Sequence, residues 1–147
     1  MPDHRSPAPV IRADVDHVFV YGTLRRGGAN DITLLKPAPI FICMATLAGR
    51  LFSLGAYPGL VLGGQEAVVG EVYAVSPALQ RQLDQIEEVA PVSTGEYDKR
   101  RVAVSVQGSG LDCWVYEIHP SRLLHAPEIP GGDWIVHLHG DIDPRDA

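Results

Sequence analysis

Cysteine is scarce in this sequence, which has two in 147 residues. Two are too few for the disulfide framework of a small secreted protein, and Cys43 and Cys113 do not form a Cys-x-x-Cys pair. A disulfide scaffold, a redox motif and a cysteine nucleophile are therefore not indicated. We expect both residues to lie in strands, reduced, as small hydrophobic side chains.

Clustered positive charge and long apolar runs are lacking too. The formal net charge is −6 and the longest basic run is Lys99-Arg100-Arg101, so we expect no nucleic-acid or membrane partner. No stretch approaches the ~20 apolar residues of a membrane span. Residues 1–16 carry prolines and alternating charges without the apolar core of a signal peptide. We therefore expect a cytoplasmic protein.

The length suits one domain with its own core, stable without disulfides or metal. Hydrophobic residues make up 46% and charged residues 20%, as in ordinary soluble domains. We expect a flexible leader over residues 1–16, a single folded domain over 17–139 and a short acidic tail over 140–147.

Most apolar segments predict strands, because they are rich in β-branched and aromatic residues or alternate with polar ones. Gln107-Gly108-Ser109-Gly110 joins two of them into a predicted hairpin, and residues 55–64 are expected to form a loop. The expected strands cover residues 18–21, 40–54, 67–75, 97–107, 111–118 and 134–139.

One helix is clearly predicted after Ser76, an N-cap residue followed by Pro77 at the first helical position. Leu79, Leu83 and Ile86 then form a single apolar stripe. A second, shorter helix is predicted over residues 30–35. Many short strands with one or two helices favour an α+β fold built on a small mixed β-barrel, closed or nearly closed.

The segment His17–Gly28 ends a strand at Gly22 and then offers backbone amides, the Thr23 hydroxyl and the guanidinium groups of Arg25 and Arg26. Consecutive amides in a turn can converge on one anion, so this loop is a candidate binding site. The alternative is an ordinary turn, in which Gly22 supplies a positive φ and both arginines are solvated.

Glu87 lies at the end of the predicted helix, four residues after Leu83, so it flanks the apolar stripe and faces inward. Glu88 is about 100° further round and faces water. Burial of a carboxylate disfavours its charge and raises its pKa toward the range useful for proton transfer. The alternative is that Glu87 simply ends a helix.

Several other residues allow two interpretations. Tyr97 and Tyr116 either line a cavity or only pack, whereas Tyr73 follows the strand period and is expected in the core. Trp134 is expected to plug one end of the fold, with Asp133 positioning a loop.

His137 and His139 alternate on one face of the last predicted strand, a spacing compatible with metal ligands. No third ligand lies nearby in the sequence, so we expect no metal.

Seven motifs follow one another along residues 19–134. They are Phe-Val-Tyr-Gly-Thr-Leu-Arg-Arg-Gly at 19–27, Tyr-Pro-Gly-Leu at 57–60, Val-Gly-Glu-Val-Tyr at 69–73, Leu-Asp-Gln-Ile-Glu-Glu at 83–88, Tyr-Asp-Lys-Arg-Arg-Val-Ala-Val at 97–104, Trp-Val-Tyr at 114–116 and Gly-Gly-Asp-Trp at 131–134. Any one is common, but the ordered set closely resembles the γ-glutamylcyclotransferase-like superfamily, in particular its AIG2-like branch.

The resemblance implies a small β-barrel whose cavity takes a γ-glutamyl substrate, without cofactor or metal. The loop after the first strand would hold the substrate α-carboxylate with its amides. Glu87 would take a proton from the α-ammonium, the freed amine would attack the γ-carbonyl, and 5-oxoproline and an amine would be released. The expected substrate-binding residues are Tyr21, Gly22, Thr23, Leu24, Arg25, Tyr97 and Tyr116.

Three positions depart from the family pattern. Glu88 stands where glycine is frequent, Ile86 where an aromatic residue is frequent, and Lys99 where arginine is frequent, which puts a bidentate carboxylate contact there in doubt. Two other functions remain open from the sequence. One is a non-catalytic barrel that binds a small acidic metabolite or a protein partner, and the other is a hydrolase or acyl-transfer enzyme that uses the same carboxylate.

Overall fold

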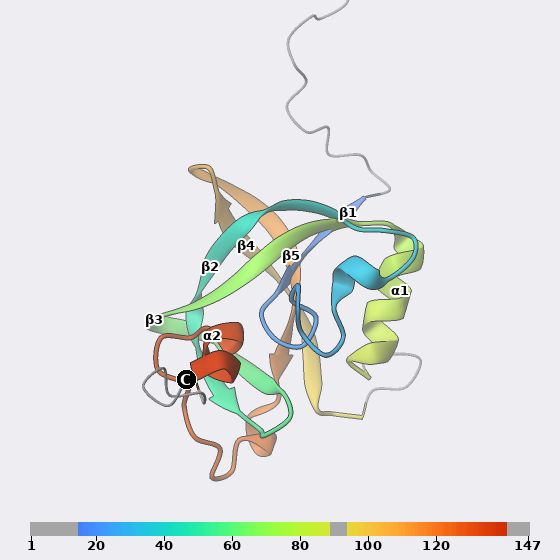
Figure 1. Ribbon diagram of the computed structural model, residues 1–147. Helices are drawn as coiled ribbons and strands as arrows, with labels where there is room; N and C mark the ends of the chain where they lie inside the picture. Colours follow the sequence, from blue (N-terminus) through green and yellow to red (C-terminus); the bar gives the residue numbers. More distant parts are fainter. Residues whose placement is uncertain (1–14, 89–93, 141–147) are drawn as a thin grey trace, which may run out of the picture.

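Strand β1 (Asp16–Val20) lies in the middle of the sheet, and the other elements are arranged around it (Figure 1). The computed structural model describes residues 15–88 and 94–140, so almost all of the expected leader and tail lies outside it. Within those ranges five strands form one sheet in the order β2-β3-β1-β5-β4. The other strands are β2 (Ile40–Ser53), β3 (Pro58–Val75), β4 (Tyr97–Val106) and β5 (Ser109–Ile118).

The sheet is mixed, as predicted. Strand β1 runs antiparallel to β3 and parallel to β5, with Val18 beside Trp114. The predicted hairpin is formed by β4 and β5, which pair antiparallel from Tyr97 opposite Ile118 to Val106 opposite Ser109. In this hairpin the start of β4 and the end of β5 lie beside the end of β1.

The sheet curls without closing into a barrel. Over the described residues no ladder joins the edge strands β2 and β4. Apolar side chains fill the space between them instead, because Leu47 of β2 and Val104 of β4 belong to the same buried cluster. The α+β class predicted from the sequence is therefore confirmed, with an open sheet in place of a closed one.

Strand β3 begins earlier than the sequence predicts. It starts at Pro58, inside the expected loop 55–64, and pairs with β2 to form a long antiparallel hairpin. The ladder is interrupted where Ala48 and Gly49 face Ala67 and Leu62, which leaves the residues between Leu62 and Ala67 as a bulge in β3. Gly63 and Gly64 lie in this bulge with positive φ values, and glycines of this kind made the segment look like a loop in the sequence.

Helix α1 (Pro77–Ile86) begins as predicted, with the Ser76 side chain accepting a hydrogen bond from the Leu79 amide. Its buried residues are Leu79 and Leu83. The shorter predicted helix is present as the 3-10 helix η1 (Ile32–Leu34), and a further 3-10 turn, η2 (Pro120–Arg122), follows β5.

The last predicted strand is wrong, because residues 134–140 form helix α2 (Trp134–Gly140). Asp133 lies directly before it and accepts a hydrogen bond from the Val136 amide at 3.1 Å, which is the role of an N-cap side chain. His137 and His139 therefore lie about 200° apart around a helix, on opposite sides. The shared strand face that suggested metal ligands does not exist.

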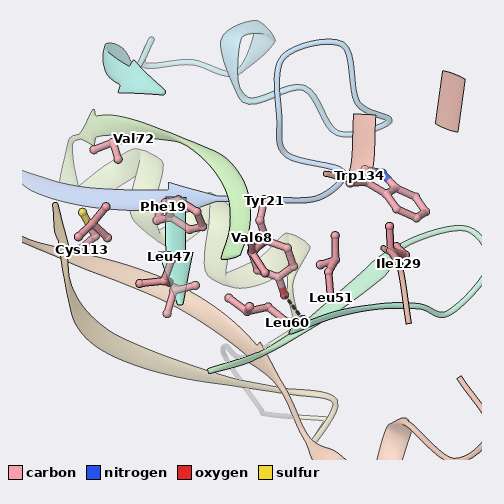
Figure 2. Close-up of a cluster of buried hydrophobic side chains, with 12 residues drawn as sticks. Phe19, Tyr21, Leu47, Leu51, Leu60, Val68, Val72, Cys113, Ile129 and Trp134 are labelled. Atoms are coloured by element: carbon pink, nitrogen blue, oxygen red, sulfur yellow. Dashed lines mark hydrogen bonds between the residues drawn. The ribbon is translucent and has the colours of Figure 1, made fainter. Parts of the chain in front are cut away.

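Two apolar clusters lie on opposite sides of β1. Phe19 and Tyr21 belong to the first, whereas Val18 and Val20 belong to the second. Figure 2 shows the first cluster, which runs from Cys113 at one end to Trp134 at the other. Trp134 is buried there, as expected, and both cysteines are free and lie in strands. Helix α1 packs on the second cluster, next to the point where β1 ends.

Candidate active site

A cavity of about 340 Å³ lies where β1 runs out into the loop that follows it. Its wall comes from that loop, from the C-terminal end of α1, and from tyrosines at the facing ends of β4 and β5. The structure brings together seven of the residues predicted for the site. They are Tyr21, Gly22, Thr23, Leu24, Glu87, Tyr97 and Tyr116.

The backbone amides of Gly22, Thr23 and Leu24 are free to bind a ligand. The carbonyl oxygens of these three residues accept hydrogen bonds from the turn that follows, at 2.8 to 3.0 Å. Among the hydrogen bonds of residues 15–88 and 94–140, none uses their amides as donors. Because a backbone N–H needs an acceptor, these groups can bind solvent or an anionic ligand in the cavity.

Gly22 is required by a close approach, and not by its φ. Its φ is not among the positive values of the chain, so the interpretation of a left-handed turn residue is wrong. A Cβ at this position would lie 2.7 Å from Cγ and 2.9 Å from Cδ of Pro58, closer than side-chain carbons pack. Glycine therefore lets the loop sit directly against the start of β3.

Arg25 is absent from the cavity wall, although the sequence suggested that it binds substrate. Its side chain is buried and points to the other side of the loop. There Nε donates to Glu71 at 2.8 Å and Nη1 donates to Asp133 at 2.7 Å. Glu71 also accepts from the Arg26 amide at 2.9 Å and from the Tyr73 hydroxyl at 2.7 Å. Arg25 thus fastens the loop to β3 and to the start of α2.

Glu87 is the C-cap residue of α1 and its side chain lines the cavity. Its backbone amide donates to the Leu83 carbonyl at 2.9 Å, which fixes where the side chain leaves the helix. Within the described part of the chain its carboxylate has no hydrogen bond or ion pair. Burial raises its pKa from 4.5 to about 7, and the nearby charges of Glu96 and Glu88 act in the same direction.

Glu88 is exposed, as the helical geometry predicts, but it still borders the cavity. Its φ is +57°, in the left-handed region that favours glycine. This is the physical reason why glycine suits the position after the helix end, and why a glutamate there carries some strain.

Three buried tyrosines surround the Glu87 side of the cavity, and each gives its hydroxyl proton to another acceptor. Tyr21 donates to the Tyr116 carbonyl at 2.6 Å, and Tyr97 donates to the Pro58 carbonyl at 2.8 Å. Tyr116 donates to Asp84 at 2.7 Å. Burial raises the pKa of all three phenols, and the Glu87 charge adds to the effect. None of these hydroxyls stabilises the Glu87 carboxylate.

Sequence reasoning did not assign Tyr57, Pro58 and Glu96 to the cavity wall. Tyr57 donates its hydroxyl proton to Glu96 at 2.6 Å, and both side chains line the cavity beside Pro58. The motif Tyr-Pro-Gly-Leu at 57–60 contributed to the family resemblance, but no role in the site was predicted for Tyr57 or Pro58. Glu96 precedes β4 without any surrounding pattern, so no sequence signal could have identified it.

The two ends of the cavity have opposite chemistry. Free amides lie at the loop end, where a carboxylate can bind. The α1 end carries carboxylates, together with hydroxyl oxygens whose protons are donated elsewhere, so these groups can accept hydrogen bonds from a ligand. An ammonium group can bind there and lose a proton. An α-amino acid carries both groups on one carbon, so the cavity is suited to its zwitterion.

Metal ligands do not gather anywhere in residues 15–88 and 94–140: no group of three or more histidine, cysteine, aspartate or glutamate side chains is placed to hold an ion. The helices in the same residues are all too short or too polar to span a bilayer.

Comparison with known proteins gives a consistent result. The family model described as "Gamma-glutamyl cyclotransferase, AIG2-like" matches residues 18–136. A putative gamma-glutamylcyclotransferase of Vibrio cholerae is 42% identical over 118 residues, which cover 80% of this chain and 93% of the relative. The gamma-L-glutamyl-butirosin B gamma-glutamyl cyclotransferase of Niallia circulans is 36% identical over 143 residues, covering 92% and 88%.

A solved structure is also similar to this fold. The crystal structure of an AIG2-like protein from Mus musculus superposes with a TM-score of 0.64 at 26% identity, covering 82% of this chain and 94% of that one.

Proposed function

This chain belongs to the AIG2-like gamma-glutamyl cyclotransferase family, and on that premise we propose that Glu87 is the general base and acid of the reaction in the cavity described above. The activity is that of a gamma-glutamyl cyclotransferase: the α-amine of a γ-glutamyl group attacks its own γ-carbonyl and releases 5-oxoproline and an amine. The observation that carries the assignment is a partly buried carboxylate in the wall of the cavity, with a pKa of about 7. Among the described residues it has no hydrogen-bond partner, and the loop amides at the other end of the cavity have no acceptor.

The loop end of the cavity binds the substrate α-carboxylate in this proposal. Gly22, Thr23 and Leu24 supply three amides without an acceptor among the described residues. With the carboxylate held there, the α-ammonium on the same carbon is directed toward Glu87 and the tyrosine oxygens. The γ-carbonyl must then fold back toward the amine, because both lie on one short chain. Ring closure gains from this enforced proximity.

Two protons move in the reaction, and Glu87 carries them one at a time. The carboxylate first takes a proton from the α-ammonium, and the freed nitrogen forms a bond to the γ-carbon. A second proton leaves that nitrogen as the lactam forms. The bond from the γ-carbon to the departing nitrogen breaks, and this nitrogen gains both protons and leaves as an ammonium. A pKa near 7 suits a group that must take and return protons at neutral pH.

The negative charge that develops on the γ-carbonyl oxygen also needs donors. The phenols of Tyr21, Tyr97 and Tyr116 give their protons elsewhere. We therefore assign this role to a loop amide that the α-carboxylate does not use.

We propose γ-glutamyl amino acids and γ-glutamylamines as the substrate class, with the leaving amine lying toward Tyr57 and Glu96. A small-molecule partner and a cytoplasmic location, both expected from the sequence, remain part of this proposal. They are supported by the negative net charge and by the scarcity of cysteine.

The test is to incubate the pure protein with a panel of γ-glutamyl amino acids and γ-glutamylamines and to measure 5-oxoproline by mass spectrometry. Glu87→Gln should lower kcat by at least 1,000-fold, an order-of-magnitude figure for the loss of general acid–base catalysis. The matched control is Glu88→Gln, the same change one residue further on, which should keep most of the activity. An inactive Glu88→Gln with an active Glu87→Gln would contradict the assignment, and free glutamate as the product would indicate a hydrolase.

A further inference from the structure

Asp84 stands one helical turn before Glu87 on α1, outside the cavity wall, and holds the Tyr116 hydroxyl. Tyr116 Oη lies 2.7 Å from Asp84 Oδ1. On its other side Asp84 pairs with Lys99, whose Nζ lies 3.0 Å from Oδ1 and 3.1 Å from Oδ2. Lys99 is itself fixed, because it donates to Gln80 at 3.1 Å and lies 4.7 Å from the ring centre of Trp114.

This arrangement decides which way the Tyr116 proton points. The Asp84 carboxylate is paired with the Lys99 ammonium and accepts the hydrogen bond, so Tyr116 is the donor. A phenol has one proton. Once Asp84 has accepted it, the Tyr116 oxygen can offer only lone pairs to the cavity.

We propose that Asp84 is a positioning residue: it keeps the Tyr116 proton out of the cavity, so that the Tyr116 oxygen accepts a hydrogen bond from the substrate α-ammonium and does not donate to Glu87. This inference rests on the proposed function, since it assumes a γ-glutamyl substrate in this cavity. It adds a residue that touches neither substrate nor base.

Asp84 can be tested because the other tyrosines use backbone acceptors. Tyr21 and Tyr97 give their protons to the carbonyls of Tyr116 and Pro58, which a side-chain substitution leaves in place. Tyr116 alone of the three depends on a side chain. A Tyr116 hydroxyl released from Asp84 can turn toward Glu87, stabilise its carboxylate and so weaken the base.

The remaining ionisable groups around Glu87 are Glu88 at the end of the same helix and Glu96 before β4. Both are carboxylates, and both disfavour its charge. An Asp84 variant also leaves Lys99 without its carboxylate, so a movement of the pH limb that persists in the Tyr116→Phe background belongs to Lys99 and not to the Tyr116 hydroxyl.

The experiment compares Asp84→Ala, which removes both carboxylate oxygens, with Tyr116→Phe and the double variant, and its readouts are KM and the pH dependence of kcat/KM. In Asp84→Ala we expect KM to rise about tenfold, the size of one hydrogen bond to a charged group, and the acidic limb of kcat/KM to move to lower pH. In Tyr116→Phe we expect a similar rise in KM without that movement. The double variant should match Tyr116→Phe, because Asp84 acts through this hydroxyl.

Asp112→Ala is the matched control, since it is the same substitution in a carboxylate that faces Arg101 on the β4–β5 hairpin, 3.8 Å from its Nε. It should keep the wild-type KM and pH profile. A wild-type pH limb in Asp84→Ala, or effects that add in the double variant, would reduce Asp84 to a brace between α1 and β5. If Asp84→Ala does not fold, a wild-type KM in Tyr116→Phe alone overturns the proposal. Wild-type protein that releases no 5-oxoproline points instead to failure of the proposed function.

Discussion

Two glutamates lie on either side of the loop after β1, and they differ in the number of their hydrogen bonds. Glu71 is 4% exposed and accepts from the Arg25 guanidinium, the Arg26 amide and the Tyr73 hydroxyl. Glu87 has no partner among the described residues, and burial raises its pKa to about 7. The difference separates a structural carboxylate from one that can exchange a proton.

The comparison also shows how the fold divides its roles. On one side the loop is held by the ion pairs of Arg25 with Glu71 and Asp133. On the other side its backbone amides face the cavity. The three donors around Glu71 fix its carboxylate in place and hold the loop. Glu87 has no donor among the described residues, and its raised pKa lets it exchange a proton near neutral pH. Substitutions that alter one side of the loop at a time separate these two roles.

The largest effect on stability is expected on the side of the loop where Arg25 forms its ion pairs. Arg25→Met should lower the free energy of unfolding by about 3–5 kcal/mol, because the buried Glu71 and the half-buried Asp133 then lose their cation. Denaturant unfolding at neutral pH measures this. Arg50→Met is the control, since Arg50 forms an exposed pair with Glu128 and should lose less than about 1 kcal/mol. Equal losses in the two variants would show that the buried cluster does not hold the loop.

The second effect is expected at Glu87 and depends on pH. Because the folded pKa is raised from 4.5 to about 7, the fold favours the neutral carboxyl. That contribution is complete below pH 4.5 and is lost as the pH rises through 7. Glu87→Gln, which is always neutral, should therefore be more stable than wild type above pH 7, by on the order of 2 kcal/mol.

The same pair of proteins should converge in stability toward pH 4, where both side chains are neutral. Thermal unfolding across this range measures the difference. A constant difference between the variant and wild type at every pH would contradict a raised pKa.

The smallest effect is expected at Glu88. Glu88→Gly removes the strain of a φ of +57° and one negative charge near Glu87. We expect a gain of about 0.5 kcal/mol, since the relief of a left-handed residue is partly offset by the greater freedom of glycine in the unfolded chain. Glu88→Gln removes the charge but keeps the strain, so a comparison of the melting temperatures of the two variants separates the two causes.

Much of the fold could be predicted from local patterns. Helix α1 combined a capping residue, a proline and one apolar stripe, and the β4–β5 hairpin combined alternation with a glycine turn. Both signals are local, and both elements are confirmed. Helix α2 was missed because its alternating residues fit a strand, whereas its start is fixed by Asp133, which the sequence does not mark as a cap.

The site was predicted unevenly for the same reason. The inward direction of the Glu87 side chain follows from helix geometry, and the structure places this side chain in the cavity wall. The position of Arg25 depends on Glu71 and Asp133, which lie 46 and 108 residues away in the sequence. A local sequence pattern cannot indicate contacts between residues so far apart in the chain. From the sequence alone, a charged residue beside a glycine turn is therefore expected to be exposed. Glu96 was missed because it joins the cavity only through the folded sheet.

The pH dependence of kcat/KM for 5-oxoproline release by the wild-type protein is the sharpest test of Glu87 as the general base, because it reports the pKa of the essential base in the free enzyme. We expect an acidic limb with a pKa of about 7, set by Glu87. A limb near 4.5, the value of an ordinary glutamate, would contradict it.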